Sequence, residues 1–214
     1  MAKGASISGF PEWLPSERVV EQRVIDTLRK VFELNGFIGI ETRAVETGAS
    51  LLKKGETSKE IYLLSRLQEV GHESDTPIEE RLGLHFDLTV PLSRYVVEHS
   101  GALAFPFKRW QIQKVCPQEG RFREFVQADI DVIGAGDLPD HYEVELPLVM
   151  VSALEELRVY GLPKATVHAN NRKLSEGFYR GLGLTDVEGV LREIDKLDKI
   201  GADEVARLLT ETCG

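Results

Sequence analysis

The sequence has few cysteines and histidines, and neither type is clustered. Its 214 residues include two cysteines, Cys116 and Cys213, which lie far apart and lack the spacing of metal ligands or of a disulfide framework. The five histidines are scattered as well, so we expect no protein-bound zinc and no other metal site. A reduced, cytoplasmic setting is the expectation that follows.

Long apolar runs are also absent. The longest uncharged apolar stretch, Leu146 to Leu154, is far too short to cross a bilayer. The first residues, MAKGASISGFPEW, contain one lysine and none of the apolar run of roughly 7–15 residues that a secretory signal needs. We therefore expect a water-soluble protein with no membrane partner.

Basic charge is in deficit, with 26 Lys and Arg against 35 Asp and Glu and a net charge of -9. Broad coating of a nucleic acid depends on accumulated cations and is disfavoured, so any such contact has to be local. The 42% hydrophobic and 29% charged composition is that of a globular protein. The length suits one large domain, or one domain and part of another.

The most informative stretch runs from Phe105 to Gly134 and alternates on both sides of a short polar break. Alternation over this length predicts a hairpin of two half-buried strands. In the second arm one face carries Phe125, Gln127, Asp129 and Asp131, and the other carries Val126, Ala128, Ile130 and Val132. Carboxylates beside an amide suit an ammonium or a ring N–H. An ordinary sheet with a solvated face is the alternative.

Basic side chains gather on the same hairpin although the chain as a whole is acidic. They are Lys108, Arg109, Lys114, Arg121 and Arg123. A cationic turn suits phosphate groups, because charge-assisted hydrogen bonds to phosphate oxygens are strong.

The chain before the hairpin predicts a helix over 17–37, capped by Ser16 and closed at Asn35 and Gly36, and then a strand over 37–45. A second strand is expected over 60–67, followed by an acidic loop. Residues 82–87 look extended, and a helix begins at Thr89 and stops at Ser100. Asp87 and Thr89 thus lie at a strand-to-helix junction, where small charged ligands dock. Simple N-capping is the alternative.

After the hairpin we expect a helix over 141–161, capped by Asp140 and bent or shifted by Pro147. A strand over 164–171 and a helix over 172–183 follow. The last segment predicts two short amphipathic helices around Gly201. No internal repeat is present.

Several dissimilar motifs then occur in a characteristic order. The segment from Glu17 to Glu46 is similar to motif 1 of class II synthetases, with Arg43 where a proline is usual. HFDLTVPLSRYV is similar to an amino-acid-binding stretch, FREFVQADIDVIG to the outgoing strand of motif 2, and VHANNRKL and LREIDKLDKIG to later landmarks. Nearly the whole chain resembles the class II histidyl-tRNA synthetases.

The resemblance implies an α+β fold, a mixed and mainly antiparallel sheet flanked by helices and incomplete at the C-terminus. Residues 1–170 would form the N-terminal part of the catalytic core, and residues 171–214 the start of a small helical insertion module. It also implies ATP-dependent activation of L-histidine, with Mg²⁺ as the counter-ion of ATP, transfer to tRNA(His), and a homodimer formed through the first helix.

The resemblance assigns site residues by position. The histidine-binding set is Asp87, Leu88, Thr89, Gln127 and Asp131, in which Asp87, Thr89 and Gln127 hold the α-amino group and Asp131 accepts a ring N–H. Arg121 and Arg123 would face the ATP phosphates or the tRNA end. It assigns no catalytic residue, and it leaves His85 and Asp129 without a role.

The chain departs from the family at the turn of the hairpin. Val115 runs directly into Cys116 and Pro117, so that about four residues, including an Arg-x-Glu element that grips the α-phosphate, are missing from the 115–121 turn. The chain also ends before motif 3 and the anticodon-binding domain. We expect an inert Cys116.

Two functional classes follow from these departures. One is the synthetase or a fragment of it; the other is a non-catalytic relative, such as a histidine-sensing regulatory subunit of histidine biosynthesis or a dimerising module. We expect weak histidine binding with little histidine-dependent ATP–pyrophosphate exchange. The apolar stripe from Val20 to Val31 predicts a dimer, unless that stripe is buried in the chain's own core.

Overall fold

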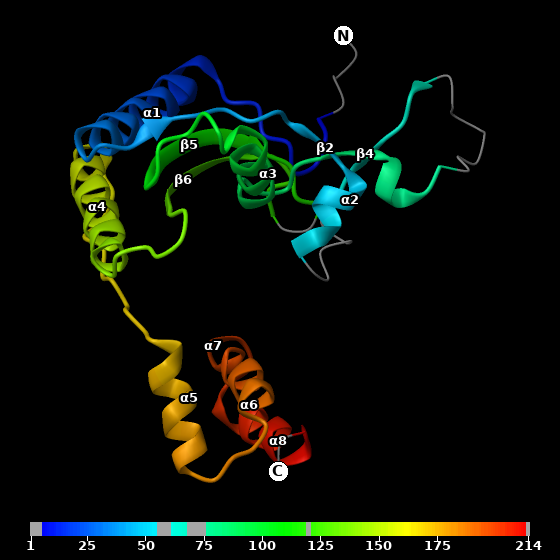
Figure 1. The fold of residues 1–214 in the computed structure, drawn as a ribbon, viewed down its shortest axis with the longest axis vertical. Coiled ribbons are helices and arrows are strands. Elements are labelled where there is room, and N and C mark those ends of the chain that lie inside the picture. The colour runs from blue at the N-terminus through cyan, green and yellow to red at the C-terminus, as the bar shows by residue number, and fades with distance from the viewer. Residues whose placement is uncertain (1–5, 55–60, 68–75, 119–120, 213–214) are drawn as a thin grey trace. The chain divides into compact units, whose positions relative to one another are not determined.

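The computed structural model describes residues 6–54, 61–67, 76–118 and 121–212. The chain divides into two compact units, Met1–Ala165 and Thr166–Gly214, which are treated separately below. The first unit contains the strands and the longest helices, and the second unit is helical (Figure 1).

The predicted hairpin is confirmed. Strand β5 (Phe107–Val115) pairs antiparallel with β6 (Phe125–Ile133) along its full length. On its other side β5 pairs in parallel with the short β1 (Ile38–Gly39), giving the order β1-β5-β6. The expected mixed sheet, mainly antiparallel, is therefore present.

A second small sheet has the order β2-β4-β3, built from β2 (Val45–Thr47), β4 (Leu82–Leu84) and β3 (Leu63–Leu64), and all its pairings are antiparallel. The predicted extended segment 82–87 contains β4. The strand predicted over 60–67 is confined to Leu63–Leu64, and residue 60 lies outside the described residues.

The single strand predicted over 37–45 is wrong, because this segment divides between the two sheets. Between β1 and β2 the chain leaves the ladder, and side chains of β5 bind the backbone there. Gln113 donates from Nε2 to the Thr42 carbonyl at 2.7 Å and accepts the Thr42 N–H at 3.3 Å. Gln111 donates to the Thr42 hydroxyl at 2.8 Å. Amide side chains thus satisfy the groups that a neighbouring strand would otherwise use.

Helix α1 (Pro15–Leu34) begins earlier than predicted, and the expected Ser16 cap is wrong. Pro15 occupies the first helical position, and the Glu17 carboxylate accepts the Leu14 N–H at 2.9 Å. Proline at this position needs no hydrogen-bond partner for its nitrogen, so the helix begins there. The predicted end is confirmed, with Asn35 as the C-cap and Gly36 at a φ of 79°.

Helix α4 (His141–Leu157) packs against α1 beside the main sheet (Figure 1). The core between these elements is formed by Val31, Phe32, Phe37, Val149 and Ala153. Pro147 lies inside α4 rather than at its start. Asp140 is the N-cap residue, as predicted, but its side chain makes no capping hydrogen bond. A short 3-10 turn, Arg158–Tyr160, follows α4.

Helix α3 (Thr89–His99) occupies its predicted place. Helix α2 (Gly48–Leu51) was not predicted; Thr47 caps it by accepting the Ser50 N–H at 3.3 Å. Short 3-10 turns cover Leu52–Lys54 and Ile78–Glu80.

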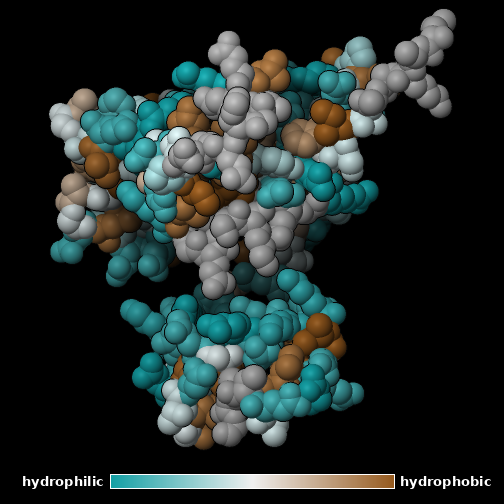
Figure 2. All heavy atoms as spheres, turned by 90° about the vertical axis from the view of Figure 1, so that its right-hand side faces the viewer, coloured by the Kyte–Doolittle hydropathy of each residue, from teal (hydrophilic) through white to brown (hydrophobic). Residues whose placement is uncertain are grey.

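The second unit contains α5 (Arg172–Gly181), α6 (Val187–Ile194), α7 (Leu197–Ile200) and α8 (Ala202–Thr212). Buried valines, Val187, Val190 and Val205, lie in α6 and α8. The sequence predicted two helices around Gly201, whereas the structure has three there, α6, α7 and α8. Hydrophilic side chains predominate on the face of this unit seen in Figure 2.

The strand predicted over 164–171 is wrong. These residues have no regular structure and are exposed. A strand is stabilised by pairing, and no described strand lies alongside this segment.

Candidate functional site

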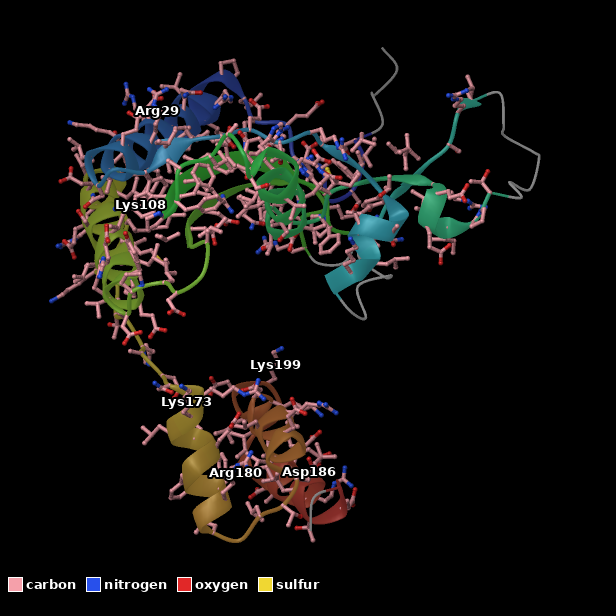
Figure 3. All side chains as sticks on the ribbon, in the orientation of Figure 1. Arg29, Lys108, Lys173, Arg180, Asp186 and Lys199 are labelled. Atoms are coloured by element: carbon pink, nitrogen blue, oxygen red, sulfur yellow. The ribbon has the colours of Figure 1, made fainter. Side chains whose placement is uncertain are left out.

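The register of the hairpin gathers polar side chains on one face of the main sheet. Directly paired residues of an antiparallel ladder point to the same side. The pairs are Arg109 with Asp131, Gln111 with Asp129, and Gln113 with Gln127. The opposite face carries Lys108 (Figure 3). Its ammonium bonds Glu145 of α4 at 2.5 Å.

Arg109 and Asp131 form an ion pair in the middle of this polar face. The Arg109 Nη2 contacts Asp131 Oδ2, and it lies 4.0 Å from Asp129 Oδ2. Arg109 is fully buried, whereas 43% of the Asp131 side chain is exposed. Burial raises the pKa of Asp131, against the opposing effect of Arg109, and the charge of Asp129 raises it further. Burial also lowers the pKa of Arg109.

Gln127 and Asp129 extend this network along β6. The Gln127 amide donates to both oxygens of Asp129 at 3.0 Å. The face is therefore a connected chain of Gln127, Asp129, Arg109 and Asp131, in which the two carboxylates share one cation. Asp129 has partners here that the sequence alone did not indicate.

The residues from Asp87 to Thr89 lie where β4 passes into α3. Asp87 is buried, and its Oδ1 accepts the Val90 N–H at 3.4 Å, so the capping interaction that the sequence allowed is present. Leu88 is fully buried, and Thr89 is exposed at the first position of α3. Thr89 also lines a groove of about 460 Å³ with Ser50 and Lys53.

His85 joins this segment to the hairpin. Its Nε2 lies 2.7 Å from the carbonyl oxygen of Lys114, and its own carbonyl accepts the Cys116 N–H at 2.9 Å. Its backbone N–H donates to the Ala44 carbonyl at 2.9 Å. A buried side chain two residues from Asp87 thus holds the end of β5, where the turn of the hairpin begins. The sequence placed His85 beside the site but gave no sign of this bond.

The turn between β5 and β6 is described except for residues 119–120. Arg121 and Arg123 are both exposed. The backbone N–H of Arg123 donates to the Gly9 carbonyl at 2.7 Å, and the Arg121 guanidinium lies 5.6 Å from the centre of the Phe122 ring. Cys116 is buried, and this burial raises the pKa of its thiol, as does the nearby Glu124.

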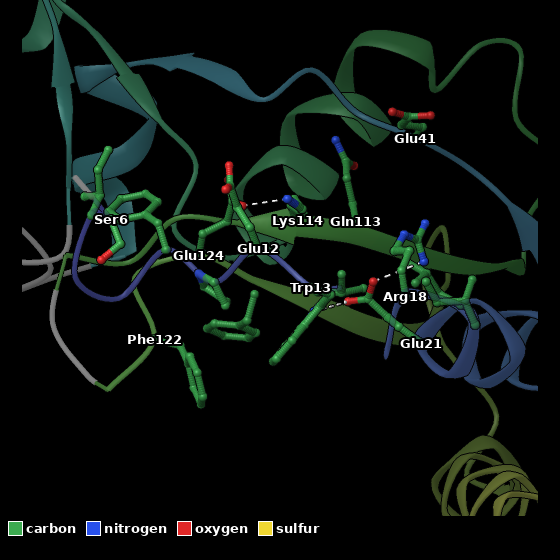
Figure 4. Close-up of a pocket in the computed structure, with 17 residues that line it drawn as sticks. Ser6, Glu12, Trp13, Arg18, Glu21, Glu41, Gln113, Lys114, Phe122 and Glu124 are labelled. Carbon is green, nitrogen blue, oxygen red and sulfur yellow. Dashed lines mark hydrogen bonds and ion pairs between the residues drawn. The ribbon is translucent and has the colours of Figure 1, made fainter. Parts of the chain in front are cut away.

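A cavity of about 1140 Å³ lies beside the turn and was not predicted (Figure 4). Its wall includes Trp13, whose indole N–H donates to Glu21 at 3.1 Å, and Lys114, whose ammonium bonds Glu124 at 2.6 Å. None of the five residues expected to bind histidine lines it. Among the described residues, no group of three or more His, Cys, Asp or Glu could hold a metal ion.

The comparisons with known proteins identify the family. No family model matches the chain. Over its whole length it is 97% identical to the histidine–tRNA ligase of Bifidobacterium longum subsp. infantis, and 58% identical to that of Micrococcus luteus. The chain belongs to the histidyl-tRNA synthetase family. The resemblance inferred from the motifs is confirmed.

The structural comparisons agree with this family. The histidyl-tRNA synthetase of Nostoc sp. PCC 7120 superposes with a TM-score of 0.83 at 35% identity, over 99% of this chain and 46% of that one. The class II synthetase fold is thereby confirmed. An ATP phosphoribosyltransferase regulatory subunit/histidyl-tRNA synthetase from Bacillus halodurans shares the fold, with a TM-score of 0.60 at 19% identity.

The chain spans about half the length of the curated relatives that it matches, 47% of the Bifidobacterium protein. The alignment of this chain with the Bifidobacterium protein covers 218 positions, whereas the chain has 214 residues. At least four positions of the relative therefore have no counterpart in this chain. That number agrees with the segment expected to be missing from the turn. No helix in the described part of the chain is long and apolar enough to cross a membrane.

Proposed function

We propose that this chain is the N-terminal part of a histidine–tRNA ligase, which activates L-histidine with ATP and transfers it to tRNA(His). The observation that carries the proposal is the 97% identity to a histidine–tRNA ligase along the whole chain. In this proposal residues 1–170 form the front of the catalytic core, and residues 171–214 begin a helical insertion module. The working location is the cytoplasm.

The polar face of the hairpin provides the histidine half of the site. Gln127, with Asp87 and Thr89, holds the α-amino group, and Asp131 accepts a ring N–H. Arg109 forms its ion pair with Asp131 through Oδ2, and Oδ1 accepts the hydrogen bond from the ligand. Such acceptors discriminate strongly, because an analogue without the N–H leaves one oxygen of a partly buried carboxylate without its hydrogen bond. Leu88 contributes through its fixed place in the core between Asp87 and Thr89.

The cationic turn provides the nucleotide half. Arg121 and Arg123 are exposed there and bind the phosphates of ATP or the tRNA end. The described carboxylates form no metal cluster, so Mg²⁺ enters with the nucleotide as the counter-ion of its phosphates. ATP supplies the leaving pyrophosphate, and the arginines stabilise the charge that develops on it.

Helix α1 is the proposed dimer contact. Leu28 packs against the chain's own core and Val31 is buried in it, but Val19 and Val20 are about half exposed. The apolar stripe is therefore shared between the core and the surface. Sedimentation at high protein concentration tests this part: a dimer that Val20→Glu weakens is expected, and a monomer at all concentrations contradicts it.

Separate calorimetric titrations with histidine and with ATP, combined with an exchange assay, test the proposed activity. We expect histidine to bind. We expect little ATP–pyrophosphate exchange, because the loss of one preorganised donor costs on the order of 10²–10³ in rate. Asp131→Asn should weaken histidine binding, whereas Lys108→Met, on the opposite face of β5, should not. Failure of the folded chain to bind histidine contradicts the proposal.

A histidine-sensing, non-catalytic protein is the second candidate. The shortened turn favours it. Histidine binding without any ATP binding would select the sensor. Binding of both ligands would select the ligase fragment.

A further inference from the structure

Arg109 is a cation with no accessible surface in the middle of β5. A buried charge has to be compensated by partners, because desolvation of an ion is costly. Neither the motifs nor the proposed binding residues give Arg109 a role.

The partners of Arg109 are the carboxylates of the proposed histidine pocket. Asp131 is its directly paired residue on β6 and contacts its guanidinium, and Asp129 lies 4.0 Å away. None of its three guanidinium nitrogens makes a hydrogen bond among the described residues, so its contact with Asp131 is an ion pair. Among the described residues, the ionic partners of Arg109 therefore all lie on the polar face of β6.

Arg109 differs from Asp131 and Asp129 in the fraction of its side chain that is exposed, and this difference separates their roles. Arg109 is sealed from solvent, while 43% of the Asp131 side chain and 23% of the Asp129 side chain remain open. A ligand arriving at this face would meet the carboxylates, with the guanidinium behind them. One cation held against two carboxylates leaves a single net negative charge for a ligand that brings hydrogen-bond donors.

We propose that Arg109 is a positioning residue that determines specificity for histidine, by fixing the Asp131 carboxylate so that its Oδ1 accepts the ring N–H. The inference rests on the proposed function. A half-exposed aspartate rotates about its side-chain torsions, and an ion pair to one oxygen removes that freedom. Preorganisation of this kind raises affinity and selectivity because less order has to be imposed on binding.

A purely structural ion pair would affect folding but not ligand choice. The two roles separate when histidine is compared with β-(2-thienyl)alanine, which has a similar ring and no ring N–H. Arg109→Gln removes the charge, Arg109→Lys keeps it, and Lys108→Met is the matched control, since Lys108 is the adjacent cation in an ion pair on the opposite face of β5.

Calorimetry on the full 214-residue chain provides the measurement. Arg109→Gln is expected to lower the affinity for histidine about tenfold or more, the effect of losing one charge-assisted hydrogen bond. The affinity for thienylalanine should stay unchanged, so selectivity falls by the same factor. Arg109→Lys should restore part of the selectivity, and Lys108→Met should match the parent chain.

The outcomes separate this inference from the proposed function. If the parent chain binds histidine and Arg109→Gln keeps the same selectivity, the inference about Arg109 is overturned and the proposed function stands. If the parent chain binds no histidine, both are overturned.

A measurement without any variant covers the case in which Arg109→Gln does not fold. In the isotope-labelled parent chain, saturating histidine should shift both the Asp131 carboxyl carbon and the Arg109 guanidinium resonances. Unshifted resonances at saturation overturn the inference.

Discussion

Arg94 of α3 holds Glu46 of β2 through hydrogen bonds from Nε to both carboxylate oxygens, at 2.8 and 3.0 Å. The Glu46 side chain is fully buried and that of Arg94 is 15% exposed. Because Thr89 begins α3 and Asp87 precedes it, this ion pair attaches the proposed amino-acid-binding segment to the second sheet.

Arg94→Met is expected to lower the free energy of unfolding by about 2–4 kcal/mol, because among the described residues it leaves the buried Glu46 carboxylate with only Arg43 as an ionic partner. Denaturant unfolding provides the measurement. Glu98→Gln is the matched control, since Glu98 binds the same arginine from an exposed position and should change stability by about 0.5 kcal/mol or less. Equal losses of unfolding free energy in the two variants would contradict the claim that the ion pair of Arg94 with Glu46 stabilises the fold.

His85→Phe is expected to lower the free energy of unfolding by about 1–3 kcal/mol, because it keeps the bulk of the side chain but leaves the Lys114 carbonyl without its donor. Hydrogen exchange of the Cys116 amide should also become faster, since that amide is bound to the His85 carbonyl. His99→Phe, at the exposed end of α3, is the control. Unchanged exchange at Cys116 would rule out the proposed link between the two segments.

Cys116 is expected to react slowly with a thiol reagent at neutral pH. Its thiol is buried, and its pKa is raised mainly by burial, so the reactive thiolate is scarce. The reaction is followed in a Cys213→Ser chain, in which Cys116 is the sole thiol. Modification in urea should be faster than modification of the folded chain; equal rates would show that the thiol is accessible and ionised.

The Asp131 carboxyl group is expected to titrate above the usual aspartate range near about 3.9. Burial is the largest cause, and Arg109 opposes it, so Arg109→Gln should raise the pKa further. Carboxyl-carbon resonances measured against pH check both shifts. A lower pKa in Arg109→Gln would contradict the ion pair.

The raised pKa of Asp131 also affects stability. The folded chain holds this proton more tightly than the unfolded chain does. The contribution to stability is therefore complete below the unfolded-state pKa, and it is lost as the pH rises through the folded-state pKa. Asp131→Asn should remove this pH-dependent loss from the free energy of unfolding.

Local patterns predicted the elements whose faces are set by their own sequence. Strict alternation identified the two arms of the hairpin, and it placed Gln127, Asp129 and Asp131 on one face. The junction before Thr89 predicted α3 correctly. These features depend on periodicity and on end signals, which are short-range properties of a chain.

Predictions failed where a distant segment competed for backbone hydrogen bonds. Nothing in residues 37–45 shows that Gln111 and Gln113 bind Thr42 and divide the segment between two sheets. The Ser16 cap failed for a local reason: Pro15 starts α1 two residues before the predicted start at Glu17, and Leu14 is the N-cap. The expected strand over 164–171 has suitable residues but no partner strand among the described residues.

The sequence by itself determined the family, the hairpin and the identity of the polar side chains, because motifs and alternation are written along the chain. Only the tertiary structure decided which distant partner a polar group has: Arg109 for Asp131, and Lys114 for His85. The physical reason is that an ion pair or hydrogen bond depends on the distance between two atoms. For residues far apart in the chain, folding sets that distance.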